Sequence, residues 1–113
     1  KCIIMKTAKN IFDDIQARTG NEIMETVLNG SGFRIERIVS RGHRSPDDFW
    51  YDQEENEWVI VLKGRAILRF EDKAESLTMN PGDFIEIKKH QRHRVEWTDP
   101  DQETVWLAVH YKS

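Results

Sequence analysis

Glu57 and His93 are the residues whose type and position first suggest chemistry. Each stands at the start of a segment in which every second residue is apolar: Val59 and Val61 follow Glu57, and Val95 follows His93. If both segments are strands, alternation puts each polar side chain on the same face as those apolar ones. A barrel with both faces turned inward would therefore place a carboxylate and an imidazole at one mouth of its cavity.

A carboxylate in that position needs a partner, because burying an unpaired charge is costly. A metal ion and a protonated histidine are two partners that would serve at Glu57. An ion pair with an arginine at the barrel mouth is a third, and its role would be structural. The sequence leaves these alternatives open.

The segments that must position the two residues are predicted to be short strands. Turn signals separate them about every 8–12 residues, which is typical of a β-sandwich or barrel, and we expect about nine strands. No helix-length segment lies between successive strands, which argues against parallel βαβ units. Lys63 and Gly64 predict a tight hairpin between two of them. The expected strands span residues 33–40, 49–51, 57–62, 65–70, 75–79, 84–87, 92–98 and 104–111.

Alternation also assigns faces to the aromatic and histidine side chains of these strands. Trp97 shares the inward face with His93 and could line a ligand pocket. His110 and Trp106 are expected on the outward face of the last strand. Trp58 is expected to face outward as well, so that it and Trp106 would mark a subunit interface.

Residues 1–32 are predicted to form an N-terminal extension, and residues 33–113 the barrel domain. In the extension, residues 21–28 carry apolar side chains at helical spacing, which indicates a short helix. A short strand is the alternative interpretation of the same segment. The apolar residues concerned are Ile23, Met24, Val27 and Leu28.

Composition excludes several classes of protein. The chain has 113 residues, which suits one domain, and its net charge of −3 comes with no basic stripe, which argues against nucleic-acid binding. No apolar run approaches the roughly 20 residues of a membrane span. Cys2 is the single cysteine, so an intramolecular disulfide cannot form and we expect a cytoplasmic protein.

Several short motifs resemble, in their order and spacing, those of small single-domain bacterial cupins. Glu57 precedes Gly64 with six residues between them, as in the first cupin motif. A Pro-Gly-Asp turn at residues 81–83, followed by a strand and His93, is similar to the second. The likeness extends over residues 34–111. It implies an all-β fold, the double-stranded β-helix or jelly-roll barrel.

The same resemblance implies a divalent metal ion, with Glu57 and His93 among its ligands. Metal-binding cupins carry a His-x-His shortly before the motif glutamate, whereas residues 50–53 of this chain contain no histidine. His43, from the loop upstream, could substitute, and two oxygen-bearing side chains could complete a mixed site for Fe, Mn, Ni or Zn. The predicted ligands are His43, Asp52, Gln53, Glu57 and His93.

Three functions are compatible with this interpretation. A metal-dependent dioxygenase, isomerase or decarboxylase is the first, and the resemblance implies it. A non-catalytic protein that binds a small molecule in the barrel is the second, and a structural barrel with a degenerate metal site is the third. We also expect a homodimer, because residues 57–62 are apolar on both faces and one face must be covered.

Overall fold

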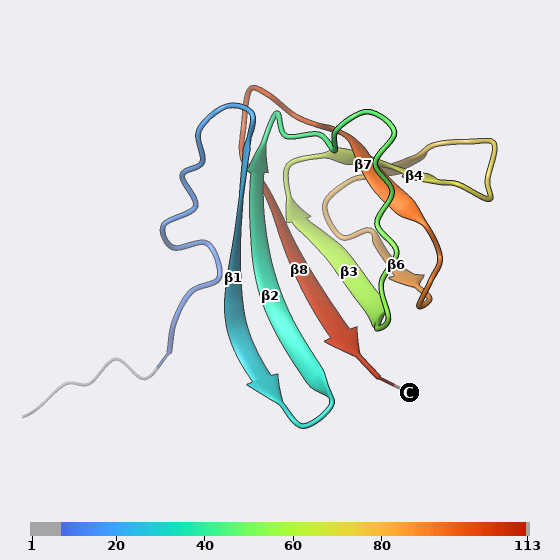
Figure 1. Cartoon of the computed structure of the whole chain (residues 1–113). Coiled ribbons are helices and arrows are strands. Elements are labelled where there is room, and N and C mark those ends of the chain that lie inside the picture. The colour runs from blue at the N-terminus through green and yellow to red at the C-terminus, as the bar shows by residue number, and fades with distance from the viewer. Residues whose placement is uncertain (1–7, 113) are drawn as a thin grey trace, which may run out of the picture.

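Two antiparallel sheets of unequal size make up the computed structural model, which describes residues 8–112 (Figure 1). Cys2 lies outside the described residues. The all-β prediction is confirmed, since the described residues contain strands and turns but no helix, and hence none that could span a membrane. The strands are β1 (Asn21–Gly30), β2 (Phe33–Arg41), β3 (Asn56–Lys63), β4 (Ala66–Phe70), β5 (Leu77–Met79), β6 (Phe84–Ile87), β7 (His93–Thr98) and β8 (Thr104–Tyr111).

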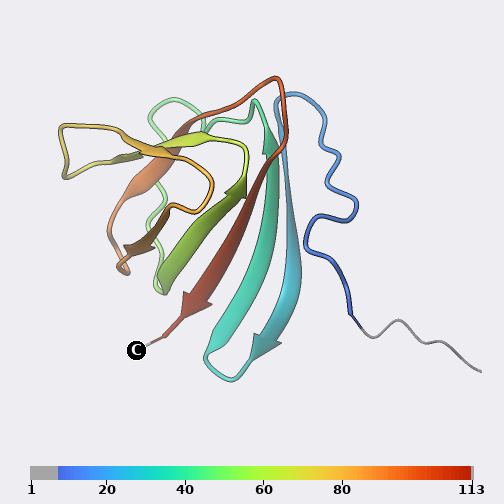
Figure 2. The same cartoon turned by 180° about the vertical axis from the view of Figure 1, so that it is seen from behind.

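The larger sheet has the strand order β1-β2-β8-β3-β6, and the smaller one has the order β5-β4-β7. They face each other as two layers, which both views show (Figures 1 and 2). Inward-pointing residues, alternating along each strand, meet between the layers and form the core. The core residues are Val59, Val61, Ala66, Leu68, Phe70, Met79, Ile87, Val95, Trp106 and Ala108.

The predicted hairpin at Gly64 is wrong, because β3 and β4 belong to different sheets. Strand β3 pairs with β6 on one side and β8 on the other, so it has no free edge for β4. The turn therefore carries the chain from one layer to the other. Gly64 has a positive φ of 85°, and a Cβ there would lie 2.6 Å from the carbonyl oxygen of Glu103. Only glycine fits this corner without strain.

The helical interpretation of residues 21–28 is also wrong, because the segment is strand β1. It pairs with β2 from Asn21 opposite Arg41 to Gly30 opposite Phe33. A bulge between Thr26 and Leu28 inserts one extra residue. The four apolar side chains of this segment are exposed, so their helical spacing does not mark a buried helix face. The division of the chain at residue 32 stays a prediction, although this hairpin crosses it.

Two other predicted strands are shorter in the structure than expected. Residues 49–51 contribute only an isolated bridge, between Tyr51 and His93, and the strand expected at residues 75–79 is reduced to β5. Strands β6 and β8 have the predicted bounds. The bounds of the two strands that are shorter than expected were predicted from the turns and loops beside them, because neither segment has a clear apolar alternation.

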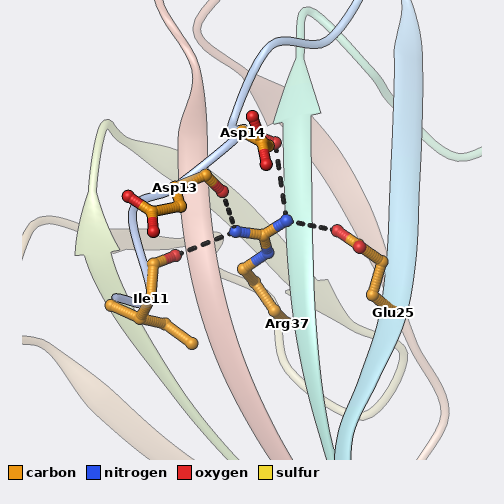
Figure 3. A network of polar contacts seen from close by, with 5 residues as sticks. All are labelled: Ile11, Asp13, Asp14, Glu25 and Arg37. Carbon is orange, nitrogen blue, oxygen red and sulfur yellow. Dashed lines mark hydrogen bonds and ion pairs between the residues drawn. The ribbon is translucent and has the colours of Figure 1, made fainter. Parts of the chain in front are cut away.

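Arg37, on β2, fastens the N-terminal segment to the outer face of the larger sheet (Figure 3). Its guanidinium is almost fully buried and donates to the carbonyl oxygens of Ile11, at 3.1 Å, Asp13, and Asp14, at 3.4 Å. It also pairs with the carboxylate of Glu25 on the neighbouring strand β1. One side chain thus satisfies three backbone acceptors and joins two strands to the segment that precedes them.

We expect Gly64→Ala to lower the free energy of unfolding by about 3 kcal/mol, since it combines left-handed strain with a backbone clash. Gly32→Ala is the matched control, because Gly32 has a φ of 81° but open space around its Cβ position. That variant should lose only about 1 kcal/mol. Urea unfolding of both measures the difference, and equal losses would show that the close approach at Gly64 does not matter.

Replacing Arg37 by Met keeps the length of the side chain but leaves its carbonyl partners unpaired. We expect a loss of about 2 kcal/mol in the free energy of unfolding. Arg44→Met is the control: Arg44 makes an exposed ion pair with Asp47, and its loss should cost less than about 1 kcal/mol. A stability unchanged in Arg37→Met would contradict the fastening role.

Candidate functional site

A cavity of about 70 Å³ lies between the two sheets. That volume is several times the roughly 10–15 Å³ that one water molecule needs, so the cavity has room for a small molecule. One part of the wall is apolar and belongs to the core, and the other part carries the polar groups. The residues that line it are Glu22, Met24, Ile38, Tyr51, Gln53, Glu57, Val59, Leu68, Ile87, His93, Val95, Trp106 and His110.

Glu57 and His93 meet in this cavity, as their alternation predicts. The distance from Glu57 Oε1 to His93 Nε2 is 3.9 Å, and both side chains are more than nine-tenths buried. The corner at Gly64 brings them together. Glu57 and Phe70 lie at similar distances along the chain on either side of this corner, and Phe70 is the β4 partner of His93.

The ring of His93 is held in one orientation by its second nitrogen. Nδ1 lies 2.9 Å from the carbonyl oxygen of Gln91, which can only accept, so Nδ1 carries the proton and Nε2 keeps a lone pair. Tyr51 stacks on the ring with 5.5 Å between centroids. Burial lowers the pKa of His93. A neutral imidazole therefore directs a bare nitrogen at Glu57.

Burial raises the pKa of Glu57 from 4.5 to about 7. The nearby carboxylates of Glu36 and Glu22 raise it further, whereas a hydrogen bond from Gln53 and the charge of Arg34 lower it. Near neutral pH the carboxyl is therefore divided between its protonated and ionised forms. The site contains a group that can give a proton beside a group that can accept one.

His110 lies inside the barrel, so the prediction that it faces outward is wrong. It is the β8 partner of Glu57, and its Nε2 is 3.0 Å from Glu36 Oε1. Trp106, four residues earlier on the same face of the strand, lines the cavity as well, and its predicted place at a subunit interface is also wrong. Strand β8 is apolar on both faces, so alternation alone could not tell which face was inward. Because His110 is paired directly with Glu57, whose side chain points inward, the side chain of His110 points inward too.

Trp97 lies on the outer face, contrary to the prediction. The ladder between β4 and β7 shifts between Ile67 and Leu68, which are opposite Trp97 and Val95. This bulge reverses the alternation after Val95. Trp97 instead packs under the guanidinium of Arg65, 5.3 Å from the ring centroid.

The structure brings together three of the five predicted metal ligands. Gln53, Glu57 and His93 line the cavity. Asp52 does not, because its carboxylate pairs at 2.7 Å with exposed His90. His43 lies behind the lining residues, with Nε2 3.7 Å from Glu22 Oε1.

These residues do not fit a resident divalent metal ion. Among residues 8–112, no three histidine, cysteine, aspartate or glutamate side chains are grouped to hold one. Catalytic metal centres usually have three protein ligands that converge on one point, whereas the ionisable side chains of this lining, Glu22, Glu57, His93 and His110, do not converge in that way. The metal site therefore stays a prediction from the resemblance, and the chemistry described here is that of the side chains themselves.

Several buried polar atoms around the cavity have no hydrogen-bond partner among the described residues. They include Trp106 Nε1 and Gln53 Oε1. Unsatisfied buried polar groups are few in folded proteins. Their concentration here indicates a place for a polar ligand, and no local sequence signal could have shown it.

The raised pKa of Glu57 predicts how stability depends on pH. The folded protein holds this proton up to about pH 7 and the unfolded chain only up to 4.5, so stability falls as pH rises through this window. Glu57→Gln removes the dependence. We expect the variant to gain up to about 3 kcal/mol over the wild type at pH 8 and almost nothing at pH 4.

Urea unfolding at the two pH values, with chelator present, measures the effect. Glu75→Gln, which changes an exposed glutamate in the loop between β4 and β5, is the control and should behave as the wild type. A Glu57→Gln variant that is less stable than the wild type at pH 8 would mean that a cation or another partner compensates the Glu57 carboxylate.

Comparison with known proteins agrees with the geometry. A family model for the cupin domain matches residues 36–110. A proposed mannose-6-phosphate isomerase from Ralstonia eutropha is 42% identical, with a TM-score of 0.90 over 96% of this chain and 100% of that one. No curated protein matches the chain.

More distant structures share the fold alone. A cupin-family protein from Methanocaldococcus jannaschii, with a double-stranded β-helix fold, is 18% identical, with a TM-score of 0.68 over 97% of this chain and 93% of that one. A cupin-superfamily protein from Desulfitobacterium hafniense is 13% identical, with a TM-score of 0.75 over 97% and 95%. With the fold, the cavity between the sheets and the family match in agreement, the chain belongs to the cupin family.

Proposed function

We propose that this cupin binds a small organic molecule in its barrel cavity and that Glu57 and His93 exchange a proton with it. The observation that carries the proposal is the pair itself. Two buried groups face each other at 3.9 Å, which is too long for a direct hydrogen bond. The gap can be bridged by a ligand atom that accepts from one group and donates to the other.

Each member of the pair has a defined role. Protonated Glu57 donates its O–H to the ligand, while His93 Nε2 removes a proton from a neighbouring position, so the ligand keeps its charge and its atoms. The carbonyl of Gln91 supports the step because it holds Nδ1–H of the imidazolium that forms. The apolar wall around the pair excludes water. General acid–base catalysis by such groups is worth about 10²–10⁴-fold in rate.

Proton exchange between adjacent ligand atoms is the chemistry of an isomerase. Of the three reactions that the cupin resemblance implies, isomerisation is the one that needs no oxidant and releases no carbon dioxide. The name of the Ralstonia eutropha protein supports this choice, since it proposes an isomerase. One carboxyl group that acts as an acid and one imidazole that acts as a base are sufficient for that class of reaction.

Non-catalytic binding is the second candidate. The unpartnered atoms Trp106 Nε1 and Gln53 Oε1 favour it, because they require only a ligand that satisfies them and no chemical step. In that case Glu57 and His93 would serve as recognition groups. The two candidates differ in whether a bound molecule loses a carbon-bound hydrogen to solvent.

The homodimer and the cytoplasmic location remain proposals. The dimer is supported by apolar side chains on the outer face of the larger sheet, where Trp58 packs on Phe84 with 5.3 Å between ring centroids and Phe84 is largely exposed. The location is supported by the single cysteine.

Solvent exchange tests the proposed function. Small carbonyl compounds, among them D-mannose and D-mannose 6-phosphate, are incubated with the protein in D₂O, and NMR follows loss of carbon-bound hydrogen. We expect exchange in at least one compound, reduced at least about 100-fold by Glu57→Gln and by His93→Gln.

Binding is followed separately through the indole N–H signal of Trp106, and Glu75→Gln is the control that should exchange as the wild type. Exchange that persists in both variants would contradict the assigned roles. A ligand that shifts the Trp106 signal without exchange would establish the second candidate in place of the first.

A further inference from the structure

The described residues that line the cavity include carboxylates but no lysine or arginine. Glu22, on β1, and Glu57, on β3, belong to the lining. Glu36, on β2, lies close enough for its charge to act on Glu57. Glu36 is itself paired with Arg34 and His110, so the acidic groups that face the cavity are those of Glu22 and Glu57.

The neighbouring cations do not neutralise this charge. Arg34 is the arginine that acts on the site, but its guanidinium is committed at the rim to Glu36, at 3.3 Å, and Glu55, at 3.2 Å. His93 Nε2 lies 3.9 Å from Glu57 Oε1 and His43 Nε2 lies 3.7 Å from Glu22 Oε1, and both distances are too long for a hydrogen bond. Two acidic side chains in a described lining without lysine or arginine attract a cation and repel an anion.

Aromatic rings form another part of the wall. Tyr51 and Trp106 both line the cavity, and aromatic faces attract cations. The indole Nε1–H of Trp106, a side chain only 4% exposed, has no partner among the described residues. This donor requires an oxygen acceptor, so a bare cation would not complete the site.

We infer that the cavity selects a small organic cation, an alkylammonium group that carries a neighbouring oxygen acceptor. The ammonium pairs with Glu22 and lies against the aromatic rings, while the oxygen accepts from Trp106 Nε1. This inference rests on the proposed function, that the cavity binds a small molecule, and adds the charge of that molecule.

The inference also excludes a ligand class. A phosphate ester would bring further negative charge against Glu22 and Glu57 with no lysine or arginine in the described lining to pair with it. Burying such a charge without a partner is unfavourable. The chain is therefore expected to differ in substrate class from the sugar phosphate that the name of its Ralstonia eutropha relative suggests.

Three probes test the inference. Choline carries a quaternary ammonium and a hydroxyl, 3,3-dimethylbutan-1-ol has the same shape without the charge, and D-mannose 6-phosphate is an anion. Isothermal titration calorimetry measures each affinity, and the Trp106 indole N–H signal reports occupancy of the cavity. We expect choline to bind at least about 10-fold more tightly than the neutral alcohol, and the phosphate ester not to bind.

Glu22→Gln then removes one charge without changing the shape of the cavity. It should weaken choline at least about 10-fold and leave the neutral alcohol unchanged, whereas the exposed control Glu75→Gln should change neither. If Glu22→Gln does not fold, the ratio of the choline affinity to the affinity for the neutral alcohol in the wild-type protein makes the test.

Equal affinity for choline and the alcohol would overturn the charge selectivity while leaving the proposed small-molecule site in place. Tighter binding of D-mannose 6-phosphate would overturn it in the same way. Choline that fails to shift the Trp106 signal at millimolar concentration overturns the inference outright, and loss of all cavity binding overturns the proposed function as well.

Discussion

The corner at Gly64 is the constraint on which the rest of the structure depends. The chain leaves β3 in one sheet and enters β4 in the other within two residues, at a positive φ and against the backbone of Glu103 and Thr104. Because the two strands diverge from one point, residues equally distant from it stand opposite each other across the barrel. Glu57 lies seven residues before the corner and Phe70 six residues after it, and Phe70 is the ladder partner of His93. The geometry of the site follows from a steric requirement seven residues away.

The end of the barrel that lies away from Gly64 carries polar side chains, and burying them lowers the stability of the fold. The core near Gly64 consists of fully buried aliphatic side chains such as Val61 and Ala66, while Glu57 lies in the same layer with its pKa raised by burial. An apolar residue at that position would remove the desolvation penalty. The chain therefore retains a group that opposes folding above neutral pH, a pattern that occurs at functional sites more often than elsewhere.

Much of the fold could be predicted from the sequence because strand period and turn chemistry are local signals. Strands β6 and β8 were predicted with their bounds, and the inward faces of β3 and His93 were predicted by alternation. What failed depended on pairing between distant strands. The predicted hairpin at Gly64 was wrong because β6 and β8 occupy both edges of β3. The predicted inward face of Trp97 was wrong because a bulge shifts the register of β7. The predicted outward face of His110 was wrong because β8 is apolar on both faces, so its sequence does not show which face is inward.

The departures from the metal-binding cupin pattern have a physical explanation in the loop that precedes β3. The pattern places its histidine pair at residues 50 and 52 or at 51 and 53; in this chain Tyr51 and Gln53 line the cavity, and Asp52 turns outward to His90. The amide of Gln53 hydrogen bonds to Glu57 and helps to hold the carboxyl that burial would otherwise leave unsupported. The neutral amide of Gln53 thus lies where the metal-binding pattern has the nitrogen of a histidine ligand. With no histidine pair at residues 50–53, Glu57 and His93 are available for the acid and base roles that we propose, and the barrel needs no third ligand for that proton chemistry.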